Sequence, residues 1–111
     1  TTTNGVPNIK EFGTVKDEAG FKGLLSMSSL HHVRNGVDYP AVLLTHGIND
    51  PRVAPWTSAK MTARLQAATS GQRPILFRVD FGAGHGIGST KSQRFDQMAD
   101  QMAFLFWQFA L

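Results

Sequence analysis

The chain has 111 residues, eleven Lys and Arg against eight Asp and Glu, and a net charge of +3. This length fits at most one domain, and the 41% hydrophobic share is ordinary for a globular protein with a core. The absence of cysteine excludes a disulfide framework and a thiolate metal site and leaves the redox compartment open.

The positive charges are spread along the chain from Lys10 to Arg94 without forming a run. A nucleic-acid groove usually gathers its basic residues on one face or mixes them with aromatic residues. We therefore expect no nucleic-acid partner. The first five residues lack the charged head and apolar stretch of a signal peptide, so none is expected.

The first third of the chain is predicted to hold one helix between two irregular segments. Residues 1–13 are rich in turn signals and are predicted to be a connecting segment. Residues 14–29 begin with Thr14 as a candidate cap, continue with acidic residues and carry an apolar face, which predicts a helix. Residues 28–36 are predicted to form a loop that ends in an Asn-Gly turn.

The middle of the chain, residues 39–85, has the pattern of a strand, a helix and a second strand. Residues 40–47 and 74–80 are short apolar runs, typical of strands buried on both faces of a parallel sheet. Between them, Pro55 suits the first position of a helix, which the pair at 70–71, Ser-Gly, should end. This order predicts a βαβ unit. The apolar residues expected on the helix face are Trp56, Ala59, Ala63 and Leu65.

The last part of the chain is predicted to be a long helix that starts after Ser89 and Thr90. Its final ten residues are almost wholly apolar but too short to span a bilayer, so we expect a buried helix end and no membrane partner. Such a helix must pack against other elements on several sides. Because two strands and a few helices cannot surround it, we expect residues 1–111 to be an incomplete part of a larger α/β domain. The helical stripe comprises Phe95, Met98, Met102, Leu105 and Phe109.

Asp50 and His85 are the candidate catalytic residues. Each follows one of the two predicted strands, and the carboxyl ends of parallel strands are where α/β sheets place their chemistry. An imidazole can act as a general base near neutral pH, and a carboxylate on its other nitrogen fixes the tautomer. In α/β-hydrolases the acid precedes the histidine, as it does here. No Gly-x-Ser-x-Gly nucleophile motif lies upstream of Asp50.

Plainer interpretations of the same residues stay open. Asp50 is also suited to a turn or a helix cap ahead of a proline, and His85 to an ordinary loop position. The adjacent histidines His31 and His32, and the set of His46 with Asp50 and His85, suggest a metal site. Adjacent histidines on an extended chain point apart, however, and no second ligand pair is evident, so we expect no metal. The glycines at 82–88 match no phosphate-binding motif, and no cofactor is expected.

A family resemblance rests on two motifs. The run of residues 39–53, YPAVLLTHGINDPRV, and Ala-Gly-His-Gly at 83–86 resemble the C-terminal part of the peptidase domain of prolyl oligopeptidases. The likeness continues upstream through Pro-Asn at 7–8, Glu-Phe-Gly at 11–13 and residues 27–33, so it covers nearly the whole chain. It implies the C-terminal portion of an α/β-hydrolase fold, a three-layer α/β/α architecture when complete.

The resemblance also implies roles for individual residues. Asp50 and His85 would be the acid and base of a Ser-His-Asp triad. Arg52 would hydrogen-bond a substrate carbonyl beside the scissile proline, and Val53 would line the proline pocket. Without the resemblance, Arg52 also suits a surface or structural ion-pair partner, and a valine after a turn such as Val53 commonly serves packing. The family's serine, its oxyanion-hole donors and its β-propeller have no counterpart in these residues, so the chain alone should be inactive.

The leading hypothesis is therefore a serine peptidase that cleaves short peptides on the carboxyl side of proline. Its partners would be the peptide substrate and the remainder of the peptidase, which holds the serine and the β-propeller. A non-catalytic module is an alternative, in which the apolar last helix and the open sheet edge bind a partner chain. A second alternative keeps the hydrolase chemistry but changes the substrate to an ester.

Overall fold

The computed structural model describes residues 5–86 and 89–110. They fall into two compact units, residues 1–34 and residues 35–111, and each is described by itself. The loop predicted to follow the second strand runs beyond the described range at Ile87 and Gly88.

Among its described residues, the first unit contains three helices, where the sequence predicted one. The predicted connecting segment holds a single-turn helix, α1, and the predicted loop after residue 28 holds another, α3. Both predictions were wrong because four residues are too few to show a helical repeat of apolar positions. The helices are α1 (Ile9–Phe12), α2 (Glu18–Met27) and α3 (Ser29–His32).

Helix α2 begins later than predicted. Its N-cap is Asp17, whose carboxylate accepts a hydrogen bond of 2.8 Å from the backbone N–H of Gly20, so Thr14 is not the cap. Gly20 lies in the first turn of α2, although glycine is unfavourable in helices. A side chain at this position would collide with the backbone of Thr14, so the glycine permits the chain to fold back closely before the helix begins.

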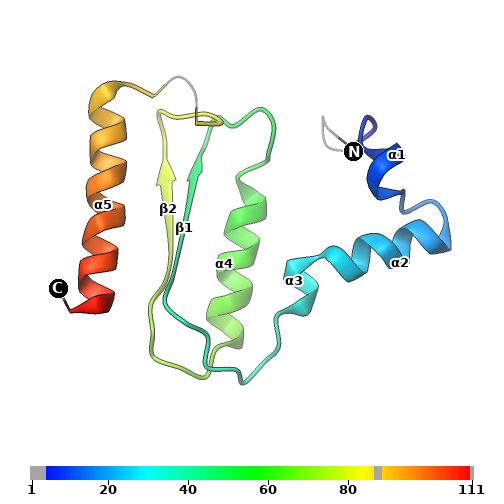
Figure 1. Ribbon diagram of the computed structural model, residues 1–111, viewed down its shortest axis with the longest axis horizontal. Coiled ribbons are helices and arrows are strands. Elements are labelled where there is room, and N and C mark those ends of the chain that lie inside the picture. The colour runs from blue at the N-terminus through cyan, green and yellow to red at the C-terminus, as the bar shows by residue number, and fades with distance from the viewer. Residues whose placement is uncertain (1–4, 87–88, 111) are drawn as a thin grey trace. The chain divides into compact units, whose positions relative to one another are not determined.

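The second unit is the predicted βαβ arrangement followed by a long helix (Figure 1). The two strands are parallel and pair in register from Val42 with Ile75 to Gly47 with Asp80, which confirms the predicted α/β class. Helices α4 and α5 lie on opposite sides of the strand pair. Because the strands are parallel and in register, both end at the same edge of the sheet, and the loops that follow them are neighbours. The elements are β1 (Val42–Gly47), α4 (Trp56–Ala68), β2 (Ile75–Asp80) and α5 (Lys91–Phe109).

Helix α4 follows Pro55 as predicted, and its buried face includes Leu65, one of the residues expected there. Its buried residues are Thr62, Leu65 and Ala68, which recur every three positions, and the helix packs against both strands. Trp56 was expected in this face and is 51% exposed, with the ammonium of Lys60 over its ring at 4.5 Å. The prediction was thus wrong for Trp56, whose ring contacts a lysine ammonium at the surface, and for Ala63, which is also exposed.

Helix α5 begins at the predicted cap. The Thr90 hydroxyl accepts from the backbone N–H of Gln93, and the Gln93 side chain accepts from the N–H of Thr90, a complete capping box. The end of α5 was predicted to be buried, and the described residues of this chain do not bury it. No described residue of α5 is buried, and the rings of Phe106, Trp107 and Phe109 are exposed.

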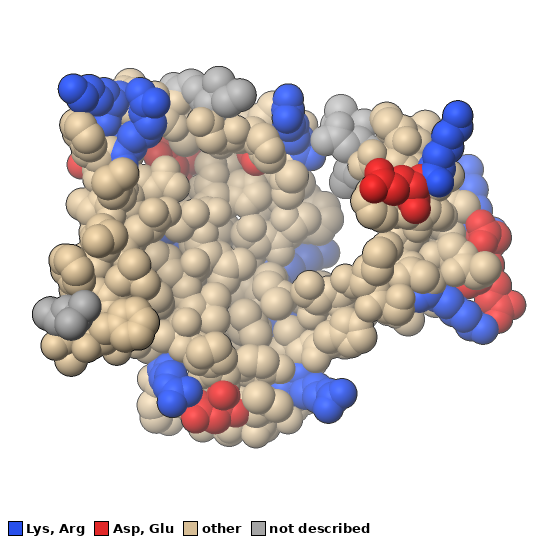
Figure 2. Space-filling view, in the orientation of Figure 1, with Lys and Arg blue, Asp and Glu red and all other residues tan. Residues whose placement is uncertain are grey.

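The strands show the same difference from the prediction. All six residues of β1 are half-buried rather than buried on both faces, and in β2 only Ile75 is fully buried. Figure 2 shows a broad face of the second unit that is free of Lys, Arg, Asp and Glu, with the charged residues near its ends. Within the described residues, no helix combines the length and the apolar character needed to cross a membrane.

Candidate active site

Asp50 and His85 meet at the carboxyl edge of the strand pair, as the sequence predicted. Asp50 lies in the loop after β1 and His85 in the loop after β2. The ring nitrogen Nδ1 of His85 lies 2.7 Å from Oδ2 of Asp50. Because a carboxylate only accepts, Nδ1 carries the hydrogen and donates it. In the neutral ring Nε2 is then an acceptor, on a side chain that is 42% exposed.

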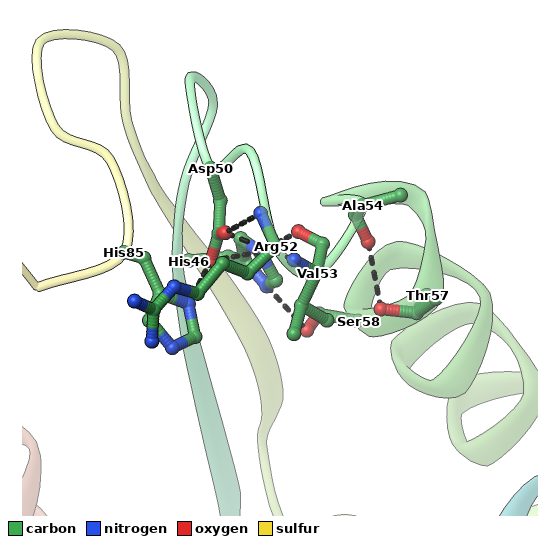
Figure 3. Close-up of polar contacts among 8 residues, drawn as sticks. All are labelled: His46, Asp50, Arg52, Val53, Ala54, Thr57, Ser58 and His85. Carbon is green, nitrogen blue, oxygen red and sulfur yellow. Dashed lines mark hydrogen bonds and ion pairs between the residues drawn. The ribbon is translucent and has the colours of Figure 1, made fainter. Parts of the chain in front are cut away.

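The carboxylate of Asp50 has a separate role for each oxygen (Figure 3). Oδ1 accepts from the backbone N–H groups of Arg52 and Val53, at 2.8 and 2.9 Å. Oδ2 accepts from His85. Asp50 was considered either as a turn residue or as the acid that pairs with His85. The two interpretations are compatible, because the turn fixes the carboxylate to which the histidine donates.

Hydrogen bonding keeps Asp50 ionised. Burial of the carboxylate raises its pKa, but donation from the Val53 N–H, from His85 and from the Arg52 N–H acts in the opposite direction. The charge of His85 adds to that effect, and the pKa of Asp50 falls from 3.8 to about 2. The side chain, only 6% exposed, is thus an anion throughout the neutral pH range.

A second histidine, His46, supports the same loop and was not predicted to do so. Its Nε2 lies 2.9 Å from the Val53 carbonyl and its Nδ1 lies 2.8 Å from the Ser58 hydroxyl. Because the carbonyl only accepts, Nε2 carries a hydrogen. The same nitrogen lies 3.4 Å from Oδ2 of Asp50, and the side chain is 9% exposed. His46 therefore ties the loop to the first turn of α4.

His46, Asp50 and His85, which were considered as a possible metal site, are not arranged as ligands. The ring nitrogens of His46 and His85 that face Asp50 both carry hydrogens, as their acceptors require, so neither presents a lone pair there. Within residues 5–86 and 89–110, no group of three His, Cys, Asp or Glu side chains is arranged to hold an ion.

Arg52 and Val53 lie in the turn that Asp50 organises. Both are exposed, and their backbone N–H groups are the donors to Oδ1. An open cleft of about 430 Å³ lies along the strand edge, with Asp50, Val53 and His85 in its lining. Val53 thus contributes to the lining of the space beside Asp50 and His85, and Arg52 is not among the lining residues. The cleft is also lined by Thr45, His46, Gly47, Arg78, Asp80, Ala83, Gly84, Gly86, Ser89 and Gln97.

Comparison with known proteins settles the family. Residues 4–111 match the prolyl oligopeptidase family. The chain belongs to the prolyl oligopeptidase family. Among curated relatives of this family member, the prolyl endopeptidase of Elizabethkingia meningoseptica is 34% identical over 110 residues, which are 98% of this chain and 16% of the relative. Dipeptidyl aminopeptidase BI of Pseudoxanthomonas mexicana is 30% identical over 107 residues, 96% of this chain and 14% of that protein.

Solved structures agree with the family assignment. A prolyl endopeptidase structure superimposes with a TM-score of 0.88 at 33% identity, covering 96% of this chain and 16% of that one. Oligopeptidase B from Leishmania major gives a TM-score of 0.85 at 27% identity, covering 95% of this chain and 14% of that one. The chain therefore spans only 14–16% of the length of these relatives.

Proposed function

We propose that residues 1–111 form the C-terminal segment of the α/β-hydrolase peptidase domain of a serine peptidase that cleaves short peptides after proline. The observation that carries this proposal is the hydrogen bond of 2.7 Å between His85 Nδ1 and Asp50 Oδ2 at the strand edge. Family membership supports the reaction class, and relatives named prolyl endopeptidase support the preference for proline.

In this proposal the nucleophilic serine lies in the remainder of the peptidase, outside these residues. It attacks the carbonyl on the carboxyl side of proline and passes its proton to Nε2 of His85, which then delivers that proton to the leaving amine. Asp50 holds the ring in the tautomer with the hydrogen on Nδ1 and stabilises the imidazolium that forms. Its low pKa suits this role because the carboxylate stays charged.

Substrate binding is assigned to the turn that follows Asp50. Arg52 would donate to the substrate carbonyl beside proline through its guanidinium, which offers fixed donors and no acceptor. Val53 would form an apolar wall for the pyrrolidine ring, and its place among the residues that line the cleft beside His85 supports this role. Because the backbone of both residues is bonded to Asp50, substrate binding and the acid share one rigid turn.

The partners in this proposal are the peptide and the remainder of the peptidase, including a β-propeller that limits substrate length. The chain alone would be inactive because it lacks the serine and the oxyanion-hole donors. Its exposed apolar residues on α5 are consistent with a surface that other parts of the domain cover.

The test uses the complete protein that contains this chain. It should be labelled by an organophosphonate serine probe and should hydrolyse proline-linked amide substrates in preference to simple esters. His85→Ala should lower turnover by at least about a thousandfold, whereas the control His31→Ala, which removes a bond to the Ser28 hydroxyl in the first unit, should stay within twofold. Ester hydrolysis without proline selectivity would favour the esterase alternative, and absence of labelling would favour the non-catalytic module.

The assignment of Arg52 has its own test. Arg52→Ala should lower kcat/KM for proline substrates by about ten- to a hundredfold while labelling by the serine probe persists, because a positioning contact is lost and the nucleophile is not. Arg73→Ala is the matched control, since Arg73 pairs with Asp38 at 3.6 Å near the opposite edge of the sheet. Unchanged selectivity for proline in Arg52→Ala would refute the assignment.

A further inference from the structure

The two loops that carry Asp50 and His85 are bonded directly to each other. The backbone N–H of Ile48 donates to the carbonyl of Asp80 at 2.9 Å, where the strand pairing ends. One residue further, the N–H of Asn49 donates to the carbonyl of Ala83 at 3.1 Å. The second loop is therefore held against the first by main-chain bonds before either reaches its functional side chain.

Asn49 adds a second bond from its side chain. Its Nδ2 lies 3.2 Å from the carbonyl oxygen of Phe81, and because a carbonyl only accepts, the amide group donates. A single residue thus binds two carbonyls of the other loop, at Phe81 and Ala83. These two anchor points lie four and two residues before His85, and Asn49 itself is the neighbour of Asp50 in the chain.

The approach of the two loops is close enough to restrict side chains. A Cβ on Gly47 would collide with the carbonyl oxygens of Ala83 and Gly84. Ala83 is among the buried apolar residues of the chain. The backbone around Ala83 is therefore fixed from one side by Gly47 and bonded by Asn49, so a shift of Asn49 moves the segment that leads to His85.

We propose that Asn49 is a positioning residue for the catalytic pair. By holding the carbonyls of Phe81 and Ala83, it sets the path of the second loop so that Nδ1 of His85 lies within hydrogen-bond distance of Asp50. Asn49 does not contact the reacting groups and acts through the two loops. This inference rests on the proposed function, in which misplacement of a catalytic group by a fraction of an ångström slows the reaction.

The side chain of Asn49 supplies one of the two bonds that hold the second loop, and the backbone of Asn49 supplies the other. Asn49→Ala keeps the N–H that binds Ala83 and removes the donor that binds Phe81. The variant thus loosens one of the two anchor points without cutting the loop free. A matched control is Asn35→Ala, since the Asn35 side chain accepts a bond of 2.7 Å from Arg64. That bond also joins segments far apart in sequence, but away from the cleft.

The experiment compares both variants in the complete protein with a proline-linked substrate. Asn49→Ala should lower kcat about tenfold while KM stays within twofold, and Asn35→Ala should keep both constants. The two variants should lose similar thermal stability, because each loses one exposed side-chain bond. A kcat within twofold of wild type for Asn49→Ala, or an equal fall of kcat in both variants, would overturn the inference.

A second measurement does not depend on turnover. The proton on Nδ1 of His85, in a short bond to a carboxylate, should give a low-field proton resonance that is lost in His85→Ala. In Asn49→Ala this resonance should broaden or move upfield, and in Asn35→Ala it should stay. If it is unchanged in Asn49→Ala, the positioning role is wrong. Should the protein cleave no proline substrate and take no serine probe, the proposed function fails, and the resonance still decides the role of Asn49.

Discussion

The carboxyl edge of the strand pair and the outer face of α5 differ in how much of their surroundings this chain provides. At the strand edge, the Asp50 carboxylate has hydrogen-bond donors from its own turn and from His85. Along α5, large apolar side chains such as Phe106 and Trp107 are exposed. The geometry of the Asp50–His85 pair is thus specified by local bonds, whereas no described residue of the last helix is buried by the rest of this chain.

The largest expected effect is the loss of turnover when the carboxylate of Asp50 at the strand edge is replaced. Asp50→Asn keeps an oxygen for the N–H groups of the turn but replaces the other oxygen with a donor, which cannot accept from His85. We expect turnover of the complete protein to fall about 10⁴-fold, as in the best-studied triad. Asp38→Asn, which alters an exposed ion pair with Arg73, should be near neutral. Turnover within tenfold of wild type in Asp50→Asn would exclude the triad role.

The next effect concerns α5. If the rest of the domain covers this helix, Phe106→Asp buries an unpaired carboxylate and should lower the stability of the complete protein by about 3 kcal/mol or more. Arg94→Asp introduces the same group into the first turns of the same helix, where a negative charge is tolerated, and should change stability by about 0.5 kcal/mol at most. Similar melting temperatures for both variants would mean that solvent covers α5 and would remove the contrast between the two regions.

A smaller effect is expected where the loops touch. Gly47→Ala places a methyl group against the carbonyls of Ala83 and Gly84, so stability should fall by about 1–3 kcal/mol and kcat should fall with it. Gly23 is the control, since a Cβ there meets no atom within 4 Å and its position in α2 favours alanine by about 0.5–1 kcal/mol. Thermal unfolding and steady-state kinetics check both. An unperturbed Gly47→Ala would show that the two loops are not rigidly apposed.

The smallest effect is on the pH dependence of stability. The pKa of Asp50 is lowered from 3.8 to about 2 in the folded chain, so the folded state binds this proton less readily than the unfolded state does. The resulting stabilisation is present above about pH 4 and is lost as the pH falls toward 2. Asp50→Asn should remove this part of the acid slope in unfolding curves, whereas Asp38→Asn should not. An unchanged slope in Asp50→Asn would contradict the lowered pKa.

The elements that the sequence predicted well are those with a strong local signal. The strands are apolar runs bounded by proline and polar residues, and α5 begins at Thr90 because the hydroxyl and Gln93 complete a capping box. Asp50 and His85 were expected to meet because each follows a parallel strand, and they do. Their roles in catalysis, and those of Arg52 and Val53, stay predictions for the experiments above.

Other features were beyond the sequence for physical reasons. The bonds of Asn49 join it to backbone carbonyls more than thirty residues away, and backbone acceptors leave no trace in the residue pattern. His46 was considered as a metal ligand, whereas its neighbours make it a donor to the Val53 carbonyl. The short helices α1 and α3 lack enough turns for a repeat, and the apolar residues of the strands and of α5 do not by themselves reveal which other atoms would bury them.

The parallel pairing of β1 and β2 has a consequence for altering this protein. The two loops at the carboxyl edge share hydrogen bonds, so an insertion into either loop would separate Asp50 from His85. The connection between α4 and β2 lies at the other edge, where Gln72 and Arg73 are exposed. A reporter group or a short epitope placed after Gln72 is therefore a way to follow the protein without disturbing its chemistry.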